Sequence, residues 1–292
     1  MLREESLLDY NLSHAHSLFA NGYVSLSLKR RFGLPYIVAV RNSDVNDFFK
    51  VRPWLRRTGV RIMEEAEQVV FISPSYRDSV LEKYVPDEKR RSIAQKSCVL
   101  PNGINDLFLS NKPRSQRVND GVIRVVQVGD INKNKNQLSV ASACEDLLRS
   151  GQSVNCLIVG RTVDKRIAGE LESYSCVTIR PPMKQRDLIE AYRSSDVFVM
   201  PSIHETFGLV YVEAMSQGLP VVYTRGQGFD GYFPEDTIGR SVDPLNKTEI
   251  KDAVLYLYKN RNEFFDSCIR ASAQFNWQKI SSEYLRLYKR IG

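Results

Sequence analysis

Residues 195–222 read SDVFVMPSIHETFGLVYVEAMSQGLPVV, a pattern of strand, loop, helix and strand. The apolar VFVM segment is typical of a buried parallel strand, and the Pro-Ser pair after it ends the strand. Thr206 can cap a helix that we expect at 207–217, and Gly218 is a residue that commonly stops one. A second apolar strand is expected at 219–223. The run therefore predicts one β-α-β unit of a parallel sheet.

Two glutamates flank the start of this helix. Glu205 precedes it at the carboxyl end of a strand, where open α/β sheets bind ligands. Glu213 follows a little over two helical turns later, so both carboxylates can line one cleft. The first free helix amides, at Phe207, Gly208 and Leu209, favour an anion. Isolated glutamates are more often solvated surface residues, but this setting favours carboxylates that accept hydrogen bonds from sugar hydroxyls and from a ribose diol.

Strand and helix patterns alternate over the rest of the chain. Further strands are expected at 11–14, 35–41, 68–72, 96–100, 122–129, 154–159 and 176–180. Further helices are expected at 2–8, 18–32, 51–66, 74–84, 136–149, 165–173, 185–194 and 277–291. Residues 111–121 are polar and aperiodic, so a domain boundary is expected there. The alternation predicts α/β domains with doubly wound parallel sheets.

Composition limits the class of protein. The 292 residues can hold two modest domains, and 42% apolar and 26% charged residues suit a globular chain. The five cysteines form no close pairs and there are only three histidines, so neither a disulfide framework nor a histidine-rich metal site is expected. The net charge of +7 suits phosphorylated substrates, anionic lipid or nucleic acid, and nucleic acid is the least favoured because no binding motif is present. No apolar run is long enough to span a membrane and the first residues do not resemble a secretory signal, so a cytoplasmic location is expected.

The run at 195–222 resembles the E-x7-E signature of retaining GT-B glycosyltransferases of family 4. The residues that carry the resemblance are Pro201, Ser202, Glu205, Thr206, Phe207, Gly208, Leu209, Glu213, Ala214, Met215, Gly218, Leu219, Pro220, Val221 and Val222. The resemblance implies two Rossmann-like domains, a partial acceptor-side domain at 1–112 and a nucleotide-sugar-binding domain at 113–275. It also implies a C-terminal helix at 276–292 that crosses back to the first domain.

The resemblance implies a reaction as well. A hexose would move from a nucleoside-diphosphate sugar to a saccharide or lipid-linked acceptor, in the synthesis of a cell-surface polysaccharide or glycoconjugate. The implied route is attack on the same face as the departing phosphate, which assists. Glu205 would hold the sugar and Glu213 the ribose, with the amides at Phe207, Gly208 and Leu209 also on the donor. No metal or other cofactor is implied, because the nucleotide sugar is a co-substrate.

A polar turn follows the strand expected at 122–129. A lysine close to a helix start can neutralise a leaving diphosphate, and Lys135 stands where relatives carry a lysine. Relatives usually have an arginine directly after the glycine that corresponds to Gly129, whereas this chain has Asp130. One phosphate contact is therefore in doubt, and Lys133 is the candidate to replace it. The alternative is that this segment is only a polar turn.

The HAH sequence at 14–16 resembles the H-x-H segment of the family, whose second histidine faces the donor sugar. His16 is therefore expected to hydrogen-bond the transferred sugar, and His14 to pack beside the strand. Arg41 and Asp44 belong to a segment that is similar to a family loop on the acceptor side. Asp44 could touch the acceptor or cap the turn that follows.

Apolar and basic side chains are interleaved at residues 46–61. They are Phe48, Phe49, Lys50, Val51, Arg52, Trp54, Leu55, Arg56, Arg57 and Arg61. Such a segment could lie on anionic lipid as a basic amphipathic face, which would make the protein peripheral at the inner face of a membrane. The alternative is an ordinary surface helix with a buried tryptophan.

The family has more chain before the H-x-H strand than the residues 1–13 that precede His14 here. The N-terminal domain is therefore expected to be incomplete at its front. A fragment, a partner chain that completes the domain and a degenerate protein all fit this pattern. The second candidate function is accordingly a truncated, non-catalytic nucleotide-sugar-binding protein, or a subunit that needs a partner.

Overall fold

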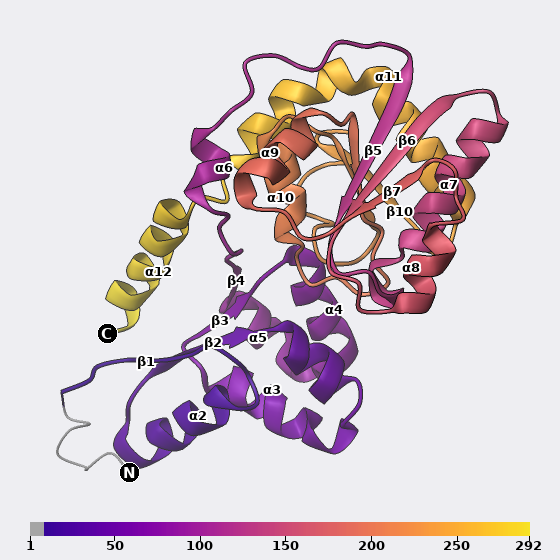
Figure 1. Cartoon of the computed structure of the whole chain (residues 1–292). Helices are drawn as coiled ribbons and strands as arrows, with labels where there is room; N and C mark the ends of the chain where they lie inside the picture. Colours follow the sequence, from indigo (N-terminus) through magenta and orange to yellow (C-terminus); the bar gives the residue numbers. More distant parts are fainter. Residues whose placement is uncertain (1–8) are drawn as a thin grey trace. The chain divides into compact units, whose positions relative to one another are not determined.

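The computed structural model describes residues 9–292, which form two compact units (Figure 1). Unit 1 contains the chain up to Asn102 together with Gln278–Gly292, and unit 2 is Gly103–Trp277. The helix expected at 2–8 lies outside the described residues. No helix in the described part of the chain is both long and apolar enough to cross a membrane.

Unit 1 is built on a four-stranded parallel sheet in the order β1-β2-β3-β4. Its elements are β1 (Ser13–Ala15), α2 (Asn21–Phe32), β2 (Tyr36–Val40), the π-helix η1 (Asp44–Phe49), the 3-10 helix η2 (Pro53–Leu55), α3 (Arg56–Glu65), β3 (Gln68–Phe71), α4 (Pro74–Tyr84), α5 (Asp87–Gln95) and β4 (Ser97–Val99). All five residues of β2 are buried, as expected for an apolar central strand of a parallel sheet.

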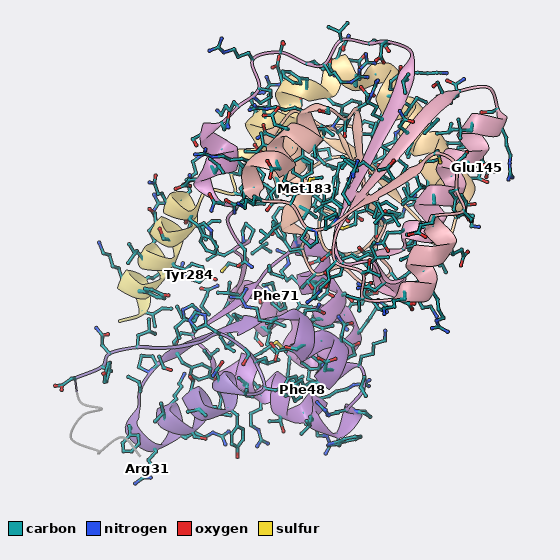
Figure 2. All side chains as sticks on the ribbon, viewed as in Figure 1. Arg31, Phe48, Phe71, Glu145, Met183 and Tyr284 are labelled. Atoms are coloured by element: carbon teal, nitrogen blue, oxygen red, sulfur yellow. The ribbon has the colours of Figure 1, made fainter. Side chains whose placement is uncertain are left out.

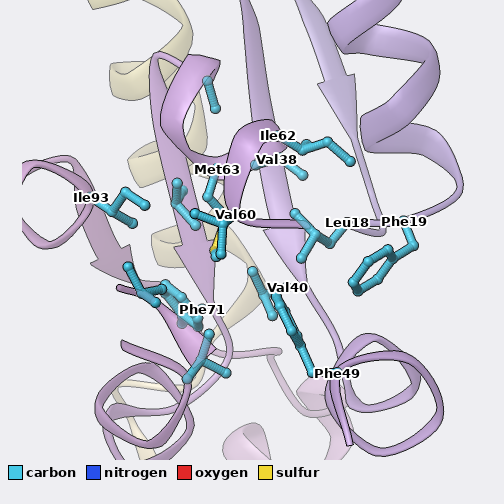
Figure 3. Packing of buried hydrophobic residues seen from close by; sticks show 14 of the residues in the cluster. Leu18, Phe19, Val38, Val40, Phe49, Val60, Ile62, Met63, Phe71 and Ile93 are labelled. Atoms are coloured by element: carbon cyan, nitrogen blue, oxygen red, sulfur yellow. The ribbon is translucent and has the colours of Figure 1, made fainter. Parts of the chain in front are cut away.

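The core of unit 1 lies between this sheet and the helices that follow its strands (Figure 3). Its labelled members are Leu18, Phe19, Val38, Val40, Phe49, Val60, Ile62, Met63, Phe71 and Ile93. Phe49 is fully buried, with its ring stacked on Tyr84 at 4.9 Å and edge-on to Phe19 at 5.1 Å between ring centroids. These aromatic contacts connect the η1 segment to α4 and to the segment after β1.

Helix α12 (Trp277–Ile291) lies almost wholly in unit 1. Tyr284, labelled in Figure 2, lies on this helix. The rings of Tyr284 and Tyr288 pack on His14 of β1, with ring centroids 5.3 and 5.7 Å away. Arg290 donates a hydrogen bond from Nη2 to Oε1 of Gln68 in β3, at 2.5 Å. The last helix is therefore attached to both β1 and β3 of the unit 1 sheet.

Unit 2 is built on a six-stranded, fully parallel sheet in the order β10-β9-β8-β5-β6-β7. Its elements are α6 (Asp106–Ser110), β5 (Val122–Val128), the 3-10 turn η3 (Lys133–Lys135), α7 (Gln137–Arg149), β6 (Ser153–Val159), α8 (Lys165–Leu171), β7 (Val177–Arg180), α9 (Gln185–Arg193), β8 (Val197–Val199), α10 (Leu209–Ser216), β9 (Val221–Thr224), β10 (Gly239–Val242) and α11 (Lys247–Ser272). The predicted parallel α/β architecture is confirmed in both units.

Several local expectations differ from the structure. The segment after β2, expected as a loop, forms η1, because Asp44 is buried and tied to the backbone there. The helix expected at 51–66 begins only at Arg56, after η2. The unit boundary lies before Gly103 rather than at residue 113, because α6 packs on α9 and α10 of unit 2.

Four further elements were not expected from the sequence: α5, α6, β10 and α11. The longest is α11, which packs on both α7 and α10. Its buried residues recur at helical spacing, and they include Ile250, Ala253, Val254, Leu257 and Phe264. That spacing is the signal that could have predicted the helix.

Candidate functional site

The strand order of unit 2 reverses between β5 and β8, which are neighbours in the sheet. The chain leaves β5 for α7 and leaves β8 for α10, so the loops after these two strands diverge above the same edge. A crevice outside the carboxyl ends of strands at such a reversal is where doubly wound sheets bind ligands. Lys135 follows β5 and Glu205 follows β8, so the fold brings both to this edge.

Lys135 and Glu205 form an ion pair, with 2.7 Å between Nζ and Oε2. The Glu205 side chain is 12% exposed and that of Lys135 is 23% exposed, so both remain reachable from solvent. A second acceptor oxygen, Glu205 Oε1, receives the N–H of Thr206 at 3.0 Å. The pair joins an ammonium that can bind phosphate to a carboxylate that can bind hydroxyl groups.

Asparagines fix the turn that carries Lys135. Asn132 Oδ1 accepts the N–H of Lys135 at 3.0 Å. Asn134 bonds to His204 in both directions, with its Oδ1 accepting the backbone N–H and its Nδ2 donating to the carbonyl, each at 3.0 Å. Asn136 adopts the left-handed conformation at φ 58° and donates to the carbonyl of Pro201 at 3.0 Å. The polar turn is therefore bound to the loop that carries Glu205, and these asparagines were not among the expected site residues.

The loop after β9 supports Glu205 from the other side. Gln227 Oε1 accepts the N–H of Glu205 at 3.0 Å, and its Nε2 donates to the carbonyl of Ile203 at 2.8 Å. The Phe207 side chain is buried among aromatic rings, including Phe229 and Phe275 at 5.9 and 5.4 Å. Both contacts hold the backbone around Glu205, and Gln227 was not among the expected site residues.

Helix α10 begins differently from the expectation. It starts at Leu209 rather than at residue 207, and its N-cap is Gly208 rather than Thr206. Gly208 has φ +81°, and a side chain there would place Cβ 2.4 Å from the ring of Tyr211, so only glycine fits. Within residues 9–292, the N–H groups of Phe207, Gly208 and Leu209 have no hydrogen-bond partner, which leaves them available to a ligand.

Glu213 lies in α10 and is half-buried. Burial raises the pKa of its carboxyl to about 7, although a hydrogen bond from the Tyr192 hydroxyl, at 3.3 Å from Oε2, opposes the rise. A carboxylate that is ionised only near neutral pH can accept hydrogen bonds from a vicinal diol when charged. Tyr192, which holds this carboxyl, was also not expected from the sequence.

The first residues after β5 lie beside Lys135. A Cβ atom added to Gly129 would lie 3.5 Å from the aliphatic carbons of the Lys135 side chain, so the Gly129 backbone is close to that side chain. Asp130 is paired with Arg161, from the loop after β6, at 2.7 Å between Oδ2 and Nη2. Lys133 is exposed in η3.

His14 lies within β1 of unit 1 and His16 directly follows this strand, with the two ring centroids 4.2 Å apart. His14 Nδ1 lies 2.7 Å from the hydroxyl of Tyr288, and burial lowers the pKa of His14 to about 4, with smaller effects of His16 and Arg41. His16 is exposed, and its carbonyl accepts a hydrogen bond from Arg41 Nε at 3.3 Å. His14 is therefore packed and neutral, while His16 and Arg41 share one exposed neighbourhood.

Asp44 is 1% exposed, so its carboxylate does not reach solvent. It accepts three backbone N–H groups, from Leu18 at 3.0 Å, Phe19 at 3.2 Å and Arg41 at 2.8 Å. All three N–H groups precede Asp44 in the chain, so the buried carboxylate holds the segment after His16 and the end of β2, and it caps no N–H of the turn that follows it.

Across residues 9–292, no group of three or more histidine, cysteine, aspartate or glutamate side chains could hold a metal ion. At the edge of β5 and β8 in unit 2, the structure instead brings together Lys135 and Glu205, next to the unpaired amides at the start of α10, while Glu213 lies further along that helix beside Tyr192. This set can bind a phosphate ester on one side and sugar hydroxyls on the other.

Comparisons with known proteins add to this geometry. A family model described as Glycosyl transferases group 1 matches residues 110–275, more than half of the chain. D-inositol 3-phosphate glycosyltransferase from Mycobacteroides abscessus is 27% identical over 99% of this chain and 69% of its own length. The protein of the same name from Paenarthrobacter aurescens is 24% identical over 96% of this chain and 72% of its own length.

Solved structures are similar over nearly the whole chain. Sucrose-phosphate synthase from Thermosynechococcus elongatus superposes with a TM-score of 0.73 at 22% identity, over 98% of this chain and 75% of that one. Anabaena HepE in complex with UDP and glucose superposes with a TM-score of 0.71 at 16% identity, over 98% of this chain and 79% of that one. At these identities the likeness establishes a shared fold.

Proposed function

Because this chain belongs to the glycosyl transferases group 1 family and is a GT-B glycosyltransferase that uses a nucleotide sugar, we propose that it transfers a hexose with retention of configuration. The donor would be a nucleoside-diphosphate sugar and the acceptor a saccharide or a lipid-linked acceptor. The subclass is family 4, and the product a cell-surface polysaccharide or glycoconjugate. A phosphorylated polyol is a further acceptor to test, because the similar proteins carry the name D-inositol 3-phosphate glycosyltransferase.

One observation carries the proposal: the ion pair of Lys135 and Glu205 at the point where the sheet order reverses. In the structure each group neutralises the other at 2.7 Å. An incoming diphosphate competes with Glu205 for the ammonium, because it carries more negative charge than a carboxylate. Donor binding would therefore move Lys135 onto the diphosphate and free Glu205 to accept hydrogen bonds from the sugar.

The remaining donor contacts follow from the same loop. The unpaired N–H groups of Phe207, Gly208 and Leu209 are at the positive end of α10 and would bind an oxygen of the donor. Glu213, when ionised, would accept hydrogen bonds from the ribose hydroxyls. Lys133 is near enough in sequence to add positive charge at the phosphates.

The chemical step needs charge stabilisation at the leaving group. The acceptor oxygen would bond to the anomeric carbon on the face from which the diphosphate leaves, as the bond from that carbon to the phosphate oxygen breaks. The acceptor proton would pass to the departing phosphate oxygen, so no protein side chain forms a covalent bond. Lys135 would stabilise the negative charge that develops on the diphosphate. We propose that this step needs no metal ion.

Two residues of unit 1 complete the proposal through the family resemblance. His16 would hydrogen-bond the transferred sugar, and Arg41 would act on the acceptor side. Both are accessible, since His16 is exposed and Arg41 is partly so. Asp44 would contribute by holding the backbone next to both residues, through its bonds to Leu18 and Arg41.

The first test is calorimetric titration of the purified chain with UDP, GDP and ADP, with and without a chelator. We expect one nucleotide to bind and its affinity to survive chelation.

Lys135→Ala and Glu205→Ala should then lower turnover about 100-fold while the thermal unfolding midpoint stays within a few degrees. Lys165→Ala, which removes an exposed lysine of α8, is the matched control and should be neutral. Full activity of both site variants would refute the proposal.

A non-catalytic nucleotide-sugar-binding protein remains the second candidate. The two functions share the donor site and differ only in the transfer step. Hydrolysis or transfer of a labelled donor sugar separates them, because binding without any turnover across a panel of acceptors supports the second candidate alone.

Exposed side chains of unit 1 support a peripheral membrane contact. Trp54 is 71% exposed and Val51 is 62% exposed, so the tryptophan of this segment is not buried as the alternative required. Residues 48–63 contain five basic residues and no acidic one. An exposed tryptophan among cationic side chains suits the headgroup region of anionic lipid at the inner face of a membrane.

Vesicle flotation tests this contact. The chain should float with vesicles that contain phosphatidylglycerol, and high salt or Trp54→Ala should reduce the bound fraction several-fold. Leu245→Ala removes a comparably exposed apolar side chain of unit 2, 74% exposed, and should change nothing. Equal binding to purely zwitterionic vesicles would argue against an electrostatic membrane contact.

A further inference from the structure

Asp130 is an acidic residue at the edge where the proposed donor site needs positive charge. It directly follows Gly129, whose backbone lies against the side chain of Lys135. An unpaired carboxylate in this place would repel the phosphates of a donor. In the structure the carboxylate is paired, with Arg161 Nη2 at 2.7 Å from its Oδ2.

The position of Arg161 is set by the backbone as well as by this ion pair. The N–H of Gly129 donates to the carbonyl of Val159 at 2.9 Å, and the N–H of Ile131 donates to the carbonyl of Arg161 at 2.8 Å. A Cβ atom on Gly160 would lie 1.9 Å from the carbonyl oxygen of Gly129, so only glycine allows this approach. The loops after β5 and β6 are therefore held together, and Arg161 reaches the edge from a neighbouring strand.

The Arg161 guanidinium has hydrogen-bonding capacity to spare. A guanidinium carries five N–H donors, and within residues 9–292 Asp130 is the one side chain that accepts from Arg161. The Arg161 side chain is 70% exposed and that of Asp130 is 39% exposed, so the other donors face solvent. A planar fork of free N–H groups matches the geometry of phosphate oxygens better than a lysine ammonium does.

We infer that Arg161, positioned by Asp130, is a donor-binding residue that contacts the diphosphate together with Lys135. Asp130 would then hold the guanidinium in place, and the positive charge that the sequence lacks at position 130 is supplied from position 161. This inference rests on the proposed donor site in unit 2. It assigns the second phosphate contact to Arg161 in preference to Lys133.

Calorimetry with the nucleoside diphosphate that binds the wild-type chain, and with the matching nucleoside, tests the inference. Arg161→Ala should lower the affinity for the diphosphate about 10-fold or more and leave the affinity for the nucleoside within twofold of the wild-type value. The affinity of Arg161→Lys for the diphosphate should lie between those of the wild type and Arg161→Ala, because the point charge of an ammonium replaces the planar guanidinium. Arg166→Ala, which removes an arginine of α8 that is 93% exposed, is the matched control and should bind both ligands as the wild type does.

A charge swap tests the positioning role of Asp130. Arg161→Asp alone leaves two carboxylates at the edge and should abolish measurable diphosphate binding. The double variant D130R/R161D restores an ion pair with the opposite polarity and should recover binding to within about threefold of the wild type. Both positions are solvent-accessible, so thermal melts should show folded variants.

The outcomes distinguish a failure of the role of Arg161 from a failure of the donor site as a whole. Tight diphosphate binding by both the wild type and Arg161→Ala would overturn the role of Arg161 and leave the donor site standing. Equal losses of affinity for the diphosphate and the nucleoside would also overturn the role of Arg161, because the lost contact would then not be with the phosphates. Failure of the folded wild-type chain to bind any of the three nucleotides would overturn the donor site and this inference together.

Discussion

At the scale of single residues, Glu213 illustrates how burial changes the chemistry of a common surface residue. Its pKa is raised to about 7, since burial disfavours the charged form more than the Tyr192 hydroxyl favours it. In an unfolded chain the same group would titrate near its ordinary value of 4.5. The folded state therefore binds the extra proton over the interval between these two values.

This shift predicts a pH dependence that Glu213→Gln removes. As pH rises from about 4.5 to 7, the unfolded chain has already released the proton and the folded chain has not, so Glu213 lowers the free energy of unfolding progressively. Between pH 4 and pH 8, the free energy of unfolding of Glu213→Gln should rise relative to that of the wild type by on the order of 3 kcal/mol. Denaturant titrations of both proteins at several pH values provide the measurement.

Nucleotide binding should respond in the opposite direction, because only the ionised carboxylate accepts from both ribose hydroxyls. Wild-type affinity should fall below pH 7, and that dependence should be absent in Glu213→Gln. A stability difference between the two proteins that does not vary with pH would contradict the proposed ionisation.

At the scale of elements, the site depends on a turn and a loop that are far apart in the sequence. Asn134 makes two hydrogen bonds to the backbone of His204. Its own carbonyl also accepts the N–H of Ile203 at 2.8 Å, so three hydrogen bonds of Asn134 join the η3 turn to the loop after β8. This pairing sets the distance between Lys135 and Glu205.

Asn134→Ala should therefore affect binding more than stability. Loss of two side-chain hydrogen bonds at a partly exposed site costs about 1–2 kcal/mol of folding free energy. Diphosphate affinity should fall about 10-fold, because the loop with Glu205 is no longer held against η3. Asn260→Ala, which removes an amide that donates to the carbonyl of Tyr256 in α11, is the control for a lost side-chain bond away from the site. Similar affinities for both variants would show that the pairing is not needed for binding.

At the scale of the whole molecule, each unit has its own sheet and its own core. The unit 1 cluster surrounds Phe49, and the unit 2 sheet buries Phe198 with aromatic neighbours at Tyr192 and Tyr211. The groups proposed to hold the nucleotide diphosphate all belong to unit 2. Damage to one core should therefore have different consequences from damage to the other.

Phe49→Ala should destabilise unit 1 by about 3–5 kcal/mol, because it empties a fully buried aromatic position. Amide hydrogen exchange should then accelerate in β2 and β3, whereas exchange in β5 and the affinity for the nucleotide should stay unchanged. Phe198→Ala is the reciprocal variant and should accelerate exchange in β5 and weaken nucleotide binding. Equal loss of protection in both units for either variant would show that they unfold as one.

Local sequence patterns were sufficient for much of the fold. The apolar run before Pro201 is the buried strand β8, Gly218 ends α10 in the left-handed conformation at φ +82°, and the parallel α/β fold and family membership are confirmed. These features depend on residues within a few positions of one another, where side-chain spacing and backbone preference act directly. The periodic apolar residues of α11 carry the same kind of signal, although that helix was not among the expected elements.

Contacts between distant residues needed the tertiary structure. Phe207 packs into an aromatic cluster that includes Phe275, which helps explain why α10 begins at Leu209, and Asp44 caps backbone groups of Leu18 and Phe19. The pairing of Asp130 with Arg161 has no local pattern at all. Strand order decides which loops meet above the sheet, and many side chains along a strand are compatible with more than one order. The sequence by itself therefore determined most of the elements and the family, whereas the meeting of charges at the proposed donor site was decided by the arrangement of the strands.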